Sequence, residues 1–252
     1  MPVIEANTTD GYQASGLTSG WDNTHDKTTS LGTLQVAATG EDFFGARAEY
    51  NAGRGIHFIV RTFFDFDLSD TSIGYITAAT FSVKTKSNGG NDIIVVKSGH
   101  DPSDTSTTWF NTWLTGLGGT ISGWGPSSTG VTAFSSNVTQ SNSDYFTDFT
   151  LNAAALSHLN SVRGTSNPFK IAVLNYDYDY LDVDPNLDGT TNAQYGGFYY
   201  ANHGTAANRP HLDFTTGADP SPGLSAGTYN NVGDEQVIFS NTIVVKKGLV
   251  KF

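Results

Sequence analysis

The feature that most constrains the fold is a succession of strand-length apolar runs separated by turn residues. The run from Ile56 to Phe66, IHFIVRTFFDF, is rich in β-branched and aromatic residues, and residues 169–174 form an apolar run of the kind found in buried strands. Residues 76–85 and 145–151 alternate between apolar and polar residues. These runs predict an all-β chain.

Turn residues suggest how some of these strands connect. The sequence Ser-Asn-Gly-Gly-Asn at 87–91 predicts a hairpin between the strand at 76–85 and a strand at 93–97. Further strands are expected at 33–37 and 211–215. Many short strands with turns between them are typical of a β-sandwich or jelly roll.

Only one segment is predicted to be helical. It runs from Ala153 to Val162, with Asn152 at the N-cap position and Gly164 just beyond its end. The composition excludes a helical bundle, because the chain has 20 Asp but only 4 Glu and few other good surface helix formers. The predicted fold is therefore an all-β jelly-roll β-sandwich with one short surface helix.

A composition shift divides the chain. Residues 217–223, GADPSPG, have the composition of a linker between a jelly-roll domain at 1–216 and a small C-terminal β tail at 224–252. Two strands are expected in the tail, at 236–239 and 242–246. About thirty residues without cysteines are too few for an independent core. The tail is expected to dock on the main domain, pair with another chain, or stay flexible.

Charge and cysteine content exclude several classes of protein. The net charge is −11, with 5 Arg among 13 basic residues, which argues against a nucleic-acid binder. No apolar run is long enough to span a membrane, and the first residues show no classical secretory signal. The absence of cysteine excludes thiol nucleophiles, thiolate metal sites and disulfides.

Five segments, in order along the chain, resemble the DNRLRE-type jelly-roll family, which is grouped with alginate-binding carbohydrate-binding modules. They are Leu34-Gln35-Val36, Arg61 to Ser69, Ile76 to Phe81, Asp104 to Trp109, and Asn208 to Phe214. The resemblance covers roughly residues 10–216 and implies a jelly-roll body of the kind found in phage structural proteins. The chain departs from the family at 199–203, where Tyr-Tyr-Ala-Asn-His replaces the usual Ser-Arg-Glu.

The sequence contains no G-x-S-x-G, phosphate-binding loop or H-E-x-x-H motif, and its six His are scattered. We therefore expect a non-enzymatic structural protein in the virion of a tailed phage, as a capsid decoration, neck or tail component. Its expected partners are other virion proteins and further copies of itself, bound through the C-terminal tail. The alternative is a secreted carbohydrate-binding module. The two are compatible, because a particle surface can adhere to glycans.

An Asp-rich loop is the predicted metal site. Asp182, Asp184, Asn186 and Asp188 supply oxygens at alternate positions, a spacing that suits Ca²⁺. The loop is not an EF-hand, because Ala193 stands where the bidentate Glu would be. An Asp-rich turn without an ion is the alternative.

Aromatic residues are the predicted ligand-binding groups. Trp109, Trp113 and Trp124 fall in a long Gly-, Ser- and Thr-rich segment, where they could contact a sugar or anchor the loop. Tyr178 lies in a stretch, 176–180, in which Tyr and Asp alternate. As a strand, this stretch would have its rings on one face and its carboxylates on the other, either binding a sugar or covering the core.

Overall fold

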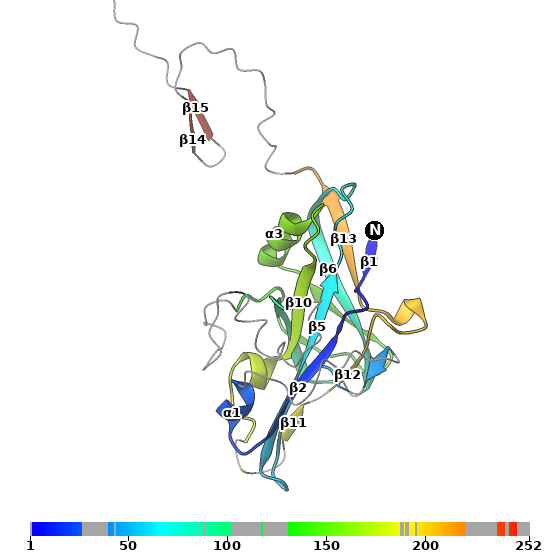
Figure 1. Cartoon of the computed structure of the whole chain (residues 1–252), viewed down its shortest axis with the longest axis vertical. Helices are drawn as coiled ribbons and strands as arrows, with labels where there is room; N and C mark the ends of the chain where they lie inside the picture. The colour runs from blue at the N-terminus through cyan, green and yellow to red at the C-terminus, as the bar shows by residue number, and fades with distance from the viewer. Residues whose placement is uncertain are drawn as a thin grey trace, which may run out of the picture. The chain divides into compact units, whose positions relative to one another are not determined.

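In a computed structural model of the chain, two antiparallel sheets pack together face to face (Figure 1). The structure describes residues 2–26, 40–42, 44–87, 89–101, 117, 131–186, 189, 192–194, 196–219, 236–239 and 242–245. The predicted all-β sandwich is confirmed. The expected strand at 33–37 lies outside the described residues.

Sheet A has six strands. In spatial order they are β1 (Val3–Glu5), β13 (His211–Gly217), β6 (Tyr75–Ser87), β12 (Gly197–Tyr199) and β3 (Glu41–Asp42), with β9 (Phe146–Thr150) also paired to β6. The long strand β6 is thus the centre of this sheet. The predicted strands at 76–85, 145–151 and 211–215 all belong to it.

Sheet B has seven strands. In spatial order they are β11 (Asn192–Gln194), β4 (Arg47–Asn51), β5 (Ile56–Phe66), β10 (Phe169–Asn175), β7 (Asp92–Lys97) and β8 (Val138–Thr139), with β2 (Gly11–Thr18) also paired to β5. Its central strands are the apolar runs predicted at 56–66, 93–97 and 169–174.

Aromatic rings fill the space between the sheets. Phe64 of β5 lies 5.3 Å from Phe81 of β6, and Phe81 stacks on Phe149 of β9 at 5.7 Å, both measured between ring centroids. Phe134 stacks on Phe169 of β10 at 5.6 Å. All five rings are buried in one apolar core. Because these residues alternate with outward-facing ones, they fix which face of each strand points inward.

The outer face of sheet B is also buried. A second apolar cluster on this face contains Phe63, Ile94, Val96, Ala172 and Leu174, all alternating with core residues of the same strands. When a strand is buried on both faces, its residues can be apolar at every position and not only at alternate ones. This explains why β5, β7 and β10 have sequences that read as continuous apolar runs.

In the part of the chain that the structure describes, four short helical segments accompany the sheets. They are α1 (Trp21–His25), α3 (Ala153–Val162), the π-helical turn η1 (Tyr176–Tyr180) and the 3₁₀ turn η2 (Ala206–Asn208). The predicted helix α3 is confirmed: the side chain of Asn152 accepts a hydrogen bond from the Ala155 N–H at 3.1 Å. Gly164 follows it in a left-handed conformation. No helix among the described residues is long and apolar enough to cross a membrane.

The predicted hairpin at 87–91 is wrong. Strand β6 belongs to sheet A and β7 to sheet B, so the connection crosses between the sheets. Its glycines serve a different purpose. Gly90 has a φ of +96° and donates its N–H to the Gln140 carbonyl at 2.8 Å, and a Cβ at Gly89 would come within 2.1 Å of the Ser141 carbonyl oxygen. The turn residues thus allow close packing against residues 140–141.

The chain divides into two compact units, Met1–Thr216 and Gly217–Phe252. The second unit contains a two-stranded antiparallel sheet made of β14 (Gln236–Phe239) and β15 (Thr242–Val245). Gln236 is opposite Val245, and Phe239 is opposite Thr242. Both strands predicted in the tail are therefore present.

Candidate functional site

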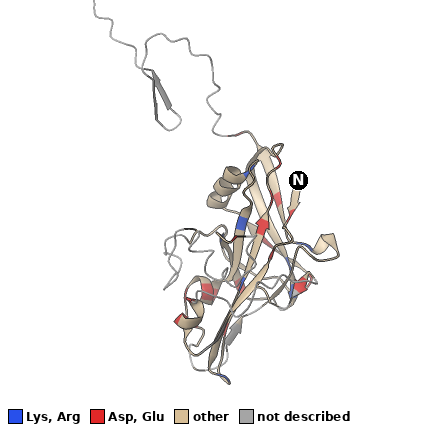
Figure 2. Cartoon of the chain, viewed as in Figure 1, with Lys and Arg blue, Asp and Glu red and all other residues tan. Residues whose placement is uncertain are grey.

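Helix α1 and the turn η1 lie beside the strands of sheet B (Figure 1). A cluster of charged side chains on the outer face of sheet B connects them to β5. We call it the charged cluster; it consists of His25, Asp26, Arg61, Asp179 and Asp182. Figure 2 shows acidic residues on both short helices. The cluster includes Asp179 of the stretch 176–180 and Asp182 of the Asp-rich loop, so it joins the two segments in which the sequence predicts a site.

Arg61 is the centre of the charged cluster. It comes from the middle of β5, and its side chain is 0% exposed. Its Nη2 donates to Asp179 Oδ1 at 2.6 Å and to the His25 carbonyl at 3.1 Å, while Nε donates to Asp179 Oδ2 at 3.0 Å. A buried guanidinium requires a paired carboxylate. Asp179 supplies it and thereby fixes η1 on β5.

His25 joins α1 to the same cluster. Its Nδ1 lies 2.9 Å from Asp26 Oδ1 and 3.3 Å from Asp182 Oδ1, and its Nε2 lies 3.0 Å from the Asp179 carbonyl oxygen. Both ring nitrogens of His25 thus lie beside hydrogen-bond acceptors. The ring of Trp21 stacks on this imidazole at 5.2 Å.

The Asp-rich loop predicted to bind calcium borders the charged cluster. Asp182, which has a φ of +54°, accepts from the Trp21 indole N–H at 2.9 Å. Asp184 Oδ1 lies 2.8 Å from His57 Nε2 and accepts from the Asn186 N–H at 2.8 Å.

Three of the predicted calcium ligands therefore already hold internal contacts. The side-chain oxygen of Asn186 accepts from the Gly189 N–H at 3.0 Å, and Asp188 lies outside the described residues. Among the described residues, no group of three or more His, Asp or Glu is arranged to hold a metal ion. Calcium would have to compete with the hydrogen bonds to His57 and Trp21. The calcium site stays a prediction.

The strand expected at 176–180 is wrong, because these residues form the turn η1. Asp179 is buried against Arg61, so the carboxylates do not share an exposed face. Tyr178 is 8% exposed and belongs to a small apolar cluster with Trp21, Ala48 and Ile59. Its role in ligand binding stays a prediction.

The other rings of this segment have separate surroundings. Tyr176 and Tyr180 stack at 5.6 Å, and burial, with a smaller contribution from Tyr176, raises the pKa of Tyr180. The three Trp predicted to contact ligands, Trp109, Trp113 and Trp124, lie outside the described residues.

Two buried titratable groups elsewhere have strongly shifted pKa values. Burial raises the pKa of Asp10 to about 8, against the lowering effect of a hydrogen bond from the Ala201 N–H. Burial also lowers the pKa of His100 to about 3, with a further contribution from Lys170. His100 Nδ1 lies 2.7 Å from the hydroxyl of Ser98, but both residues are buried, so this pair faces the interior.

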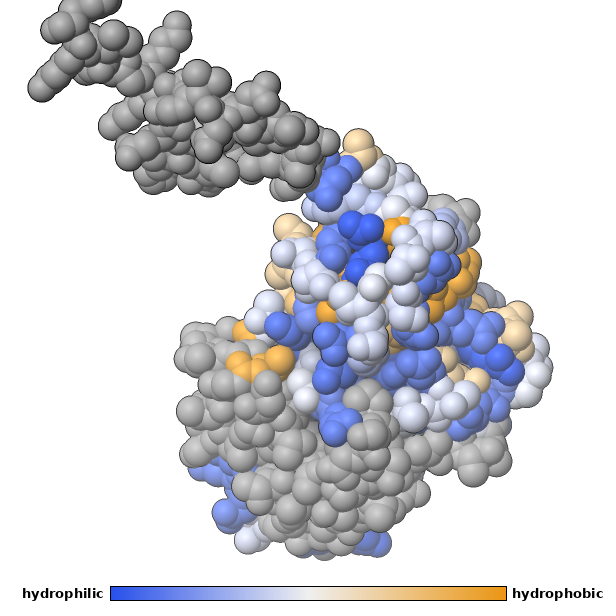
Figure 3. Space-filling model, turned by 45° about the horizontal axis from the view of Figure 1, so that its top comes forward, coloured by the Kyte–Doolittle hydropathy of each residue, from blue (hydrophilic) through white to orange (hydrophobic). Residues whose placement is uncertain are grey.

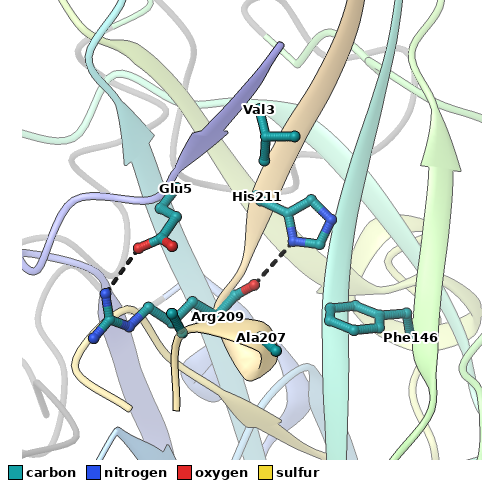
Figure 4. Close-up of a pocket in the computed structure, with 7 residues that line it drawn as sticks. Val3, Glu5, Phe146, Ala207, Arg209 and His211 are labelled. Atoms are coloured by element: carbon teal, nitrogen blue, oxygen red, sulfur yellow. Dashed lines mark hydrogen bonds and ion pairs between the residues drawn. The ribbon is translucent and has the colours of Figure 1, made fainter. Parts of the chain in front are cut away.

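A shallow pocket of about 280 Å³ opens on the outer face of sheet A (Figure 4). We call it the sheet A pocket; it is lined by Val3 and Glu5 of β1, Phe146 of β9, His211 of β13, and Ala206, Ala207 and Arg209 at η2. Apolar groups make up most of its wall. Its surroundings differ from those of the charged cluster, because this face of the sheet is open to solvent.

Two polar contacts shape the sheet A pocket. Arg209 Nη1 donates to Glu5 Oε2 at 2.8 Å, which joins η2 to β1. The His211 ring meets the edge of Phe146 at 5.2 Å, with its Nδ1 3.0 Å from the Arg209 carbonyl oxygen. Figure 4 shows the ion pair on one side of the pocket and the two rings on the other. The pocket can hold a small apolar group beside an ion pair.

Sequence reasoning found the Asp-rich segment but missed both the charged cluster and the sheet A pocket. One signal was available for the cluster: Arg61 stands alone within an apolar run, and such a cation needs a buried carboxylate. No comparable signal marks the pocket, because its residues come from three separated segments of the chain.

Neither a scan against protein-family models nor a search of curated proteins finds a match for this chain. The resemblance to the DNRLRE-type family stays a prediction.

Proposed function

We propose that this chain is a non-enzymatic structural protein of a tailed-phage particle, which self-associates and attaches through its C-terminal unit. The observation that supports this most directly is the hairpin β14–β15, which belongs to a unit separate from the sandwich. An isolated two-stranded hairpin is at best marginally stable in water. A hairpin whose described residues form a sheet of two strands is suited to pairing with another chain.

The sequence of the hairpin supports the same role. Its strands read QVIF and TIVV, so six of the eight residues are Val, Ile or Phe. Because each strand contains three consecutive apolar residues, apolar residues fall on both faces of a two-stranded sheet. Burying both faces takes partners on two sides, as an assembly provides.

The buried polar groups of the sandwich are consistent with a structural role. Arg61, Asp179 and His25 are all 0% exposed and bonded to one another, so they hold elements together. The surface is also consistent with a domain exposed on a particle, because Figure 3 shows a mainly hydrophilic face with small hydrophobic areas. Among the described residues, the large hydrophobic ones that are exposed are Val3, Tyr145, Leu181 and Val183.

Light scattering of the purified full chain tests self-association. We expect a multiple of the 26.9 kDa chain mass that falls to one chain mass in the variant Ile243→Asp. Gln236→Asp is the matched control, because it adds the same charge at a polar position of the hairpin. A full chain that stays monomeric up to high micromolar concentration would contradict the proposal.

Two further observations test the phage assignment. Genes for capsid, portal or tail proteins should adjoin the coding sequence, and peptides of the chain should be present in purified particles. The phage assignment would be excluded if the protein were absent from purified particles and the neighbouring genes encoded no particle proteins.

A further inference from the structure

Strand β1 offers an open sheet edge beside the sheet A pocket. Among the described residues, β1 is the end strand of sheet A and pairs with β13 alone, through the register Val3 to Asp213, Ile4 to Leu212 and Glu5 to His211. An edge strand presents unpaired backbone groups that can template another strand.

The hydrogen bonds identify which backbone groups point away from the sheet. The Ala6 N–H donates to the Pro210 carbonyl at 2.9 Å, and the Phe214 N–H donates to the Pro2 carbonyl at 3.3 Å. In an antiparallel pair, hydrogen-bonded and non-hydrogen-bonded positions alternate. Positions 2, 4 and 6 therefore face β13, and the N–H and C=O groups of Val3 and Glu5 face the open edge.

Those same two residues line the sheet A pocket. Val3 is 56% exposed, and the Glu5 side chain is 45% exposed although it pairs with Arg209. A chain that paired with β1 would thus run along the rim of a pocket whose wall is mostly apolar. Backbone pairing at an edge, with a pocket for one side chain, is a known mode of peptide recognition.

We propose that the open edge of β1 pairs with strand β15 of a second copy, with an aliphatic residue of that strand seated in the sheet A pocket. This inference rests on the proposed function and names the surface that the tail uses. β15 has the sequence TIVV, which favours β-strands, and its only partner among the described residues is β14. In the part of the tail that the structure describes, no strand pairs with its far edge, so this edge can join a second sheet.

The distribution of charge supports residues 1–216 of a second copy as the partner of the tail. Residues 1–216 contain 21 Asp and Glu but 10 Lys and Arg, whereas the seven residues after β15, KKGLVKF, contain three Lys and no acid. Glu5 and Asp213 lie on β1 and β13, so a strand added at this edge would bring Lys246 and Lys247 near carboxylates. Opposite charges at an interface favour association and orient it.

The length of the connection allows exchange between copies. Nineteen residues, 217–235, separate the body from β14. Fully extended, such a segment spans at most about 65 Å, which exceeds the width of a domain of this size. A tail can thus reach the β1 edge of a neighbouring copy.

A proline at position 3 tests the proposal in the full chain. Val3→Pro removes the outward-facing N–H but no hydrogen bond to β13, because proline is tolerated on the free side of an edge strand. We expect the dissociation constant of the oligomer to rise at least tenfold, measured by sedimentation velocity. Val3→Ala is the matched control; it keeps the N–H, and its smaller effect measures the side-chain contact.

Cross-linking supplies a positive test, because the chain has no cysteine. Val3→Cys protein is mixed with variants that carry one cysteine at each position of β15 in turn, and the mixture is oxidised. We expect a disulfide-linked dimer for one or two adjacent β15 positions. Tyr145→Cys, at a site that is 69% exposed and outside the proposed interface, is the control and should not cross-link selectively.

The outcomes separate this inference from the proposed function. If Ile243→Asp abolishes the oligomer but Val3→Pro and the cross-links do not differ from their controls, the tail assembles elsewhere and the inference is wrong. In a variant that carries both cysteines on one chain, cross-links formed only within that chain would likewise overturn it. If the full chain is monomeric throughout, the proposed function itself fails.

Discussion

The outer faces of the two sheets have opposite environments within one sandwich. On sheet B, Arg61 and Phe63 point outward from β5 and are both 0% exposed, whereas on sheet A the outward-facing Val3 and Glu5 are open to solvent. The Arg61–Asp179 ion pair is therefore shielded from water, and the Arg209–Glu5 ion pair is not. The difference between the two ion pairs indicates that burial beneath other elements, rather than residue type, decides how much a charged pair contributes to stability.

The largest expected effect comes from uncoupling the buried ion pair. Arg61→Met should lower the free energy of unfolding by about 3–5 kcal/mol, because it leaves the Asp179 carboxylate buried without its cation. Urea denaturation at neutral pH measures the loss. The double variant Arg61→Met with Asp179→Leu should recover most of it. A loss below about 1 kcal/mol in the single variant would mean that the buried ion pair on sheet B stabilises the fold no more than the exposed ion pair on sheet A.

A third environment is that of a buried carboxyl group whose described partner is a backbone N–H, that of Ala201. Burial raises the pKa of Asp10 from 3.8 to about 8. Between these two pH values the folded chain therefore holds a proton on Asp10 that the unfolded chain has lost. Stability from this group is therefore complete below about pH 4 and falls as the pH rises toward 8.

Asp10→Asn should remove that pH dependence. We expect it to stabilise the chain by about 2 kcal/mol at pH 7, since an amide does not ionise, and by much less at pH 4. Urea midpoints measured from pH 4 to pH 8 check this. An equal effect at both ends of the range would show that ionisation of Asp10 is not the cause.

Calcium binding tests whether the acidic loop beside sheet B carries an ion. If the loop of Asp182, Asp184, Asn186 and Asp188 binds Ca²⁺, the melting temperature should rise by several degrees in millimolar calcium relative to EDTA. Asp188→Asn should reduce the rise, and Asp213→Asn, on sheet A, should leave it unchanged. An identical melting temperature with calcium and with EDTA would exclude a structural ion.

The smallest expected effect lies on sheet A. Arg209→Met should change the free energy of unfolding by less than about 1 kcal/mol, because its ion pair with Glu5 is exposed. The small effect should shrink further in 0.5 M salt, which screens exposed charges. A cost as large as that of Arg61→Met would break the comparison between the two faces.

The sequence predicted elements whose determinants are local. Helix α3 begins at Ala153 because Asn152 caps it, and this is visible in four residues of sequence. The strands β5 and β10 follow from β-branched and aromatic runs. The hairpin at 87–91 was wrong because glycine suits both a tight turn and a close approach, and only the neighbour at 140–141 decides between them.

The candidate sites depended on contacts that sequence does not display. The alternation of Tyr and Asp at 176–180 is compatible with a strand, but the pairing of Asp179 with Arg61, 118 positions away, accompanies a helical turn instead. The sheet A pocket likewise needs β1 and η2, which stand about 200 residues apart in the chain, to meet at one sheet edge.

Local sequence alone accounted for the all-β class of the fold and for the helix at Ala153–Val162, because propensity and capping act over a few neighbouring residues. Only the assembled sheets establish which outward faces are covered, that Arg61 is buried and Glu5 exposed, and which backbone groups of β1 face away from β13. These properties belong to pairs of distant segments, so they come into existence only when the sheets assemble.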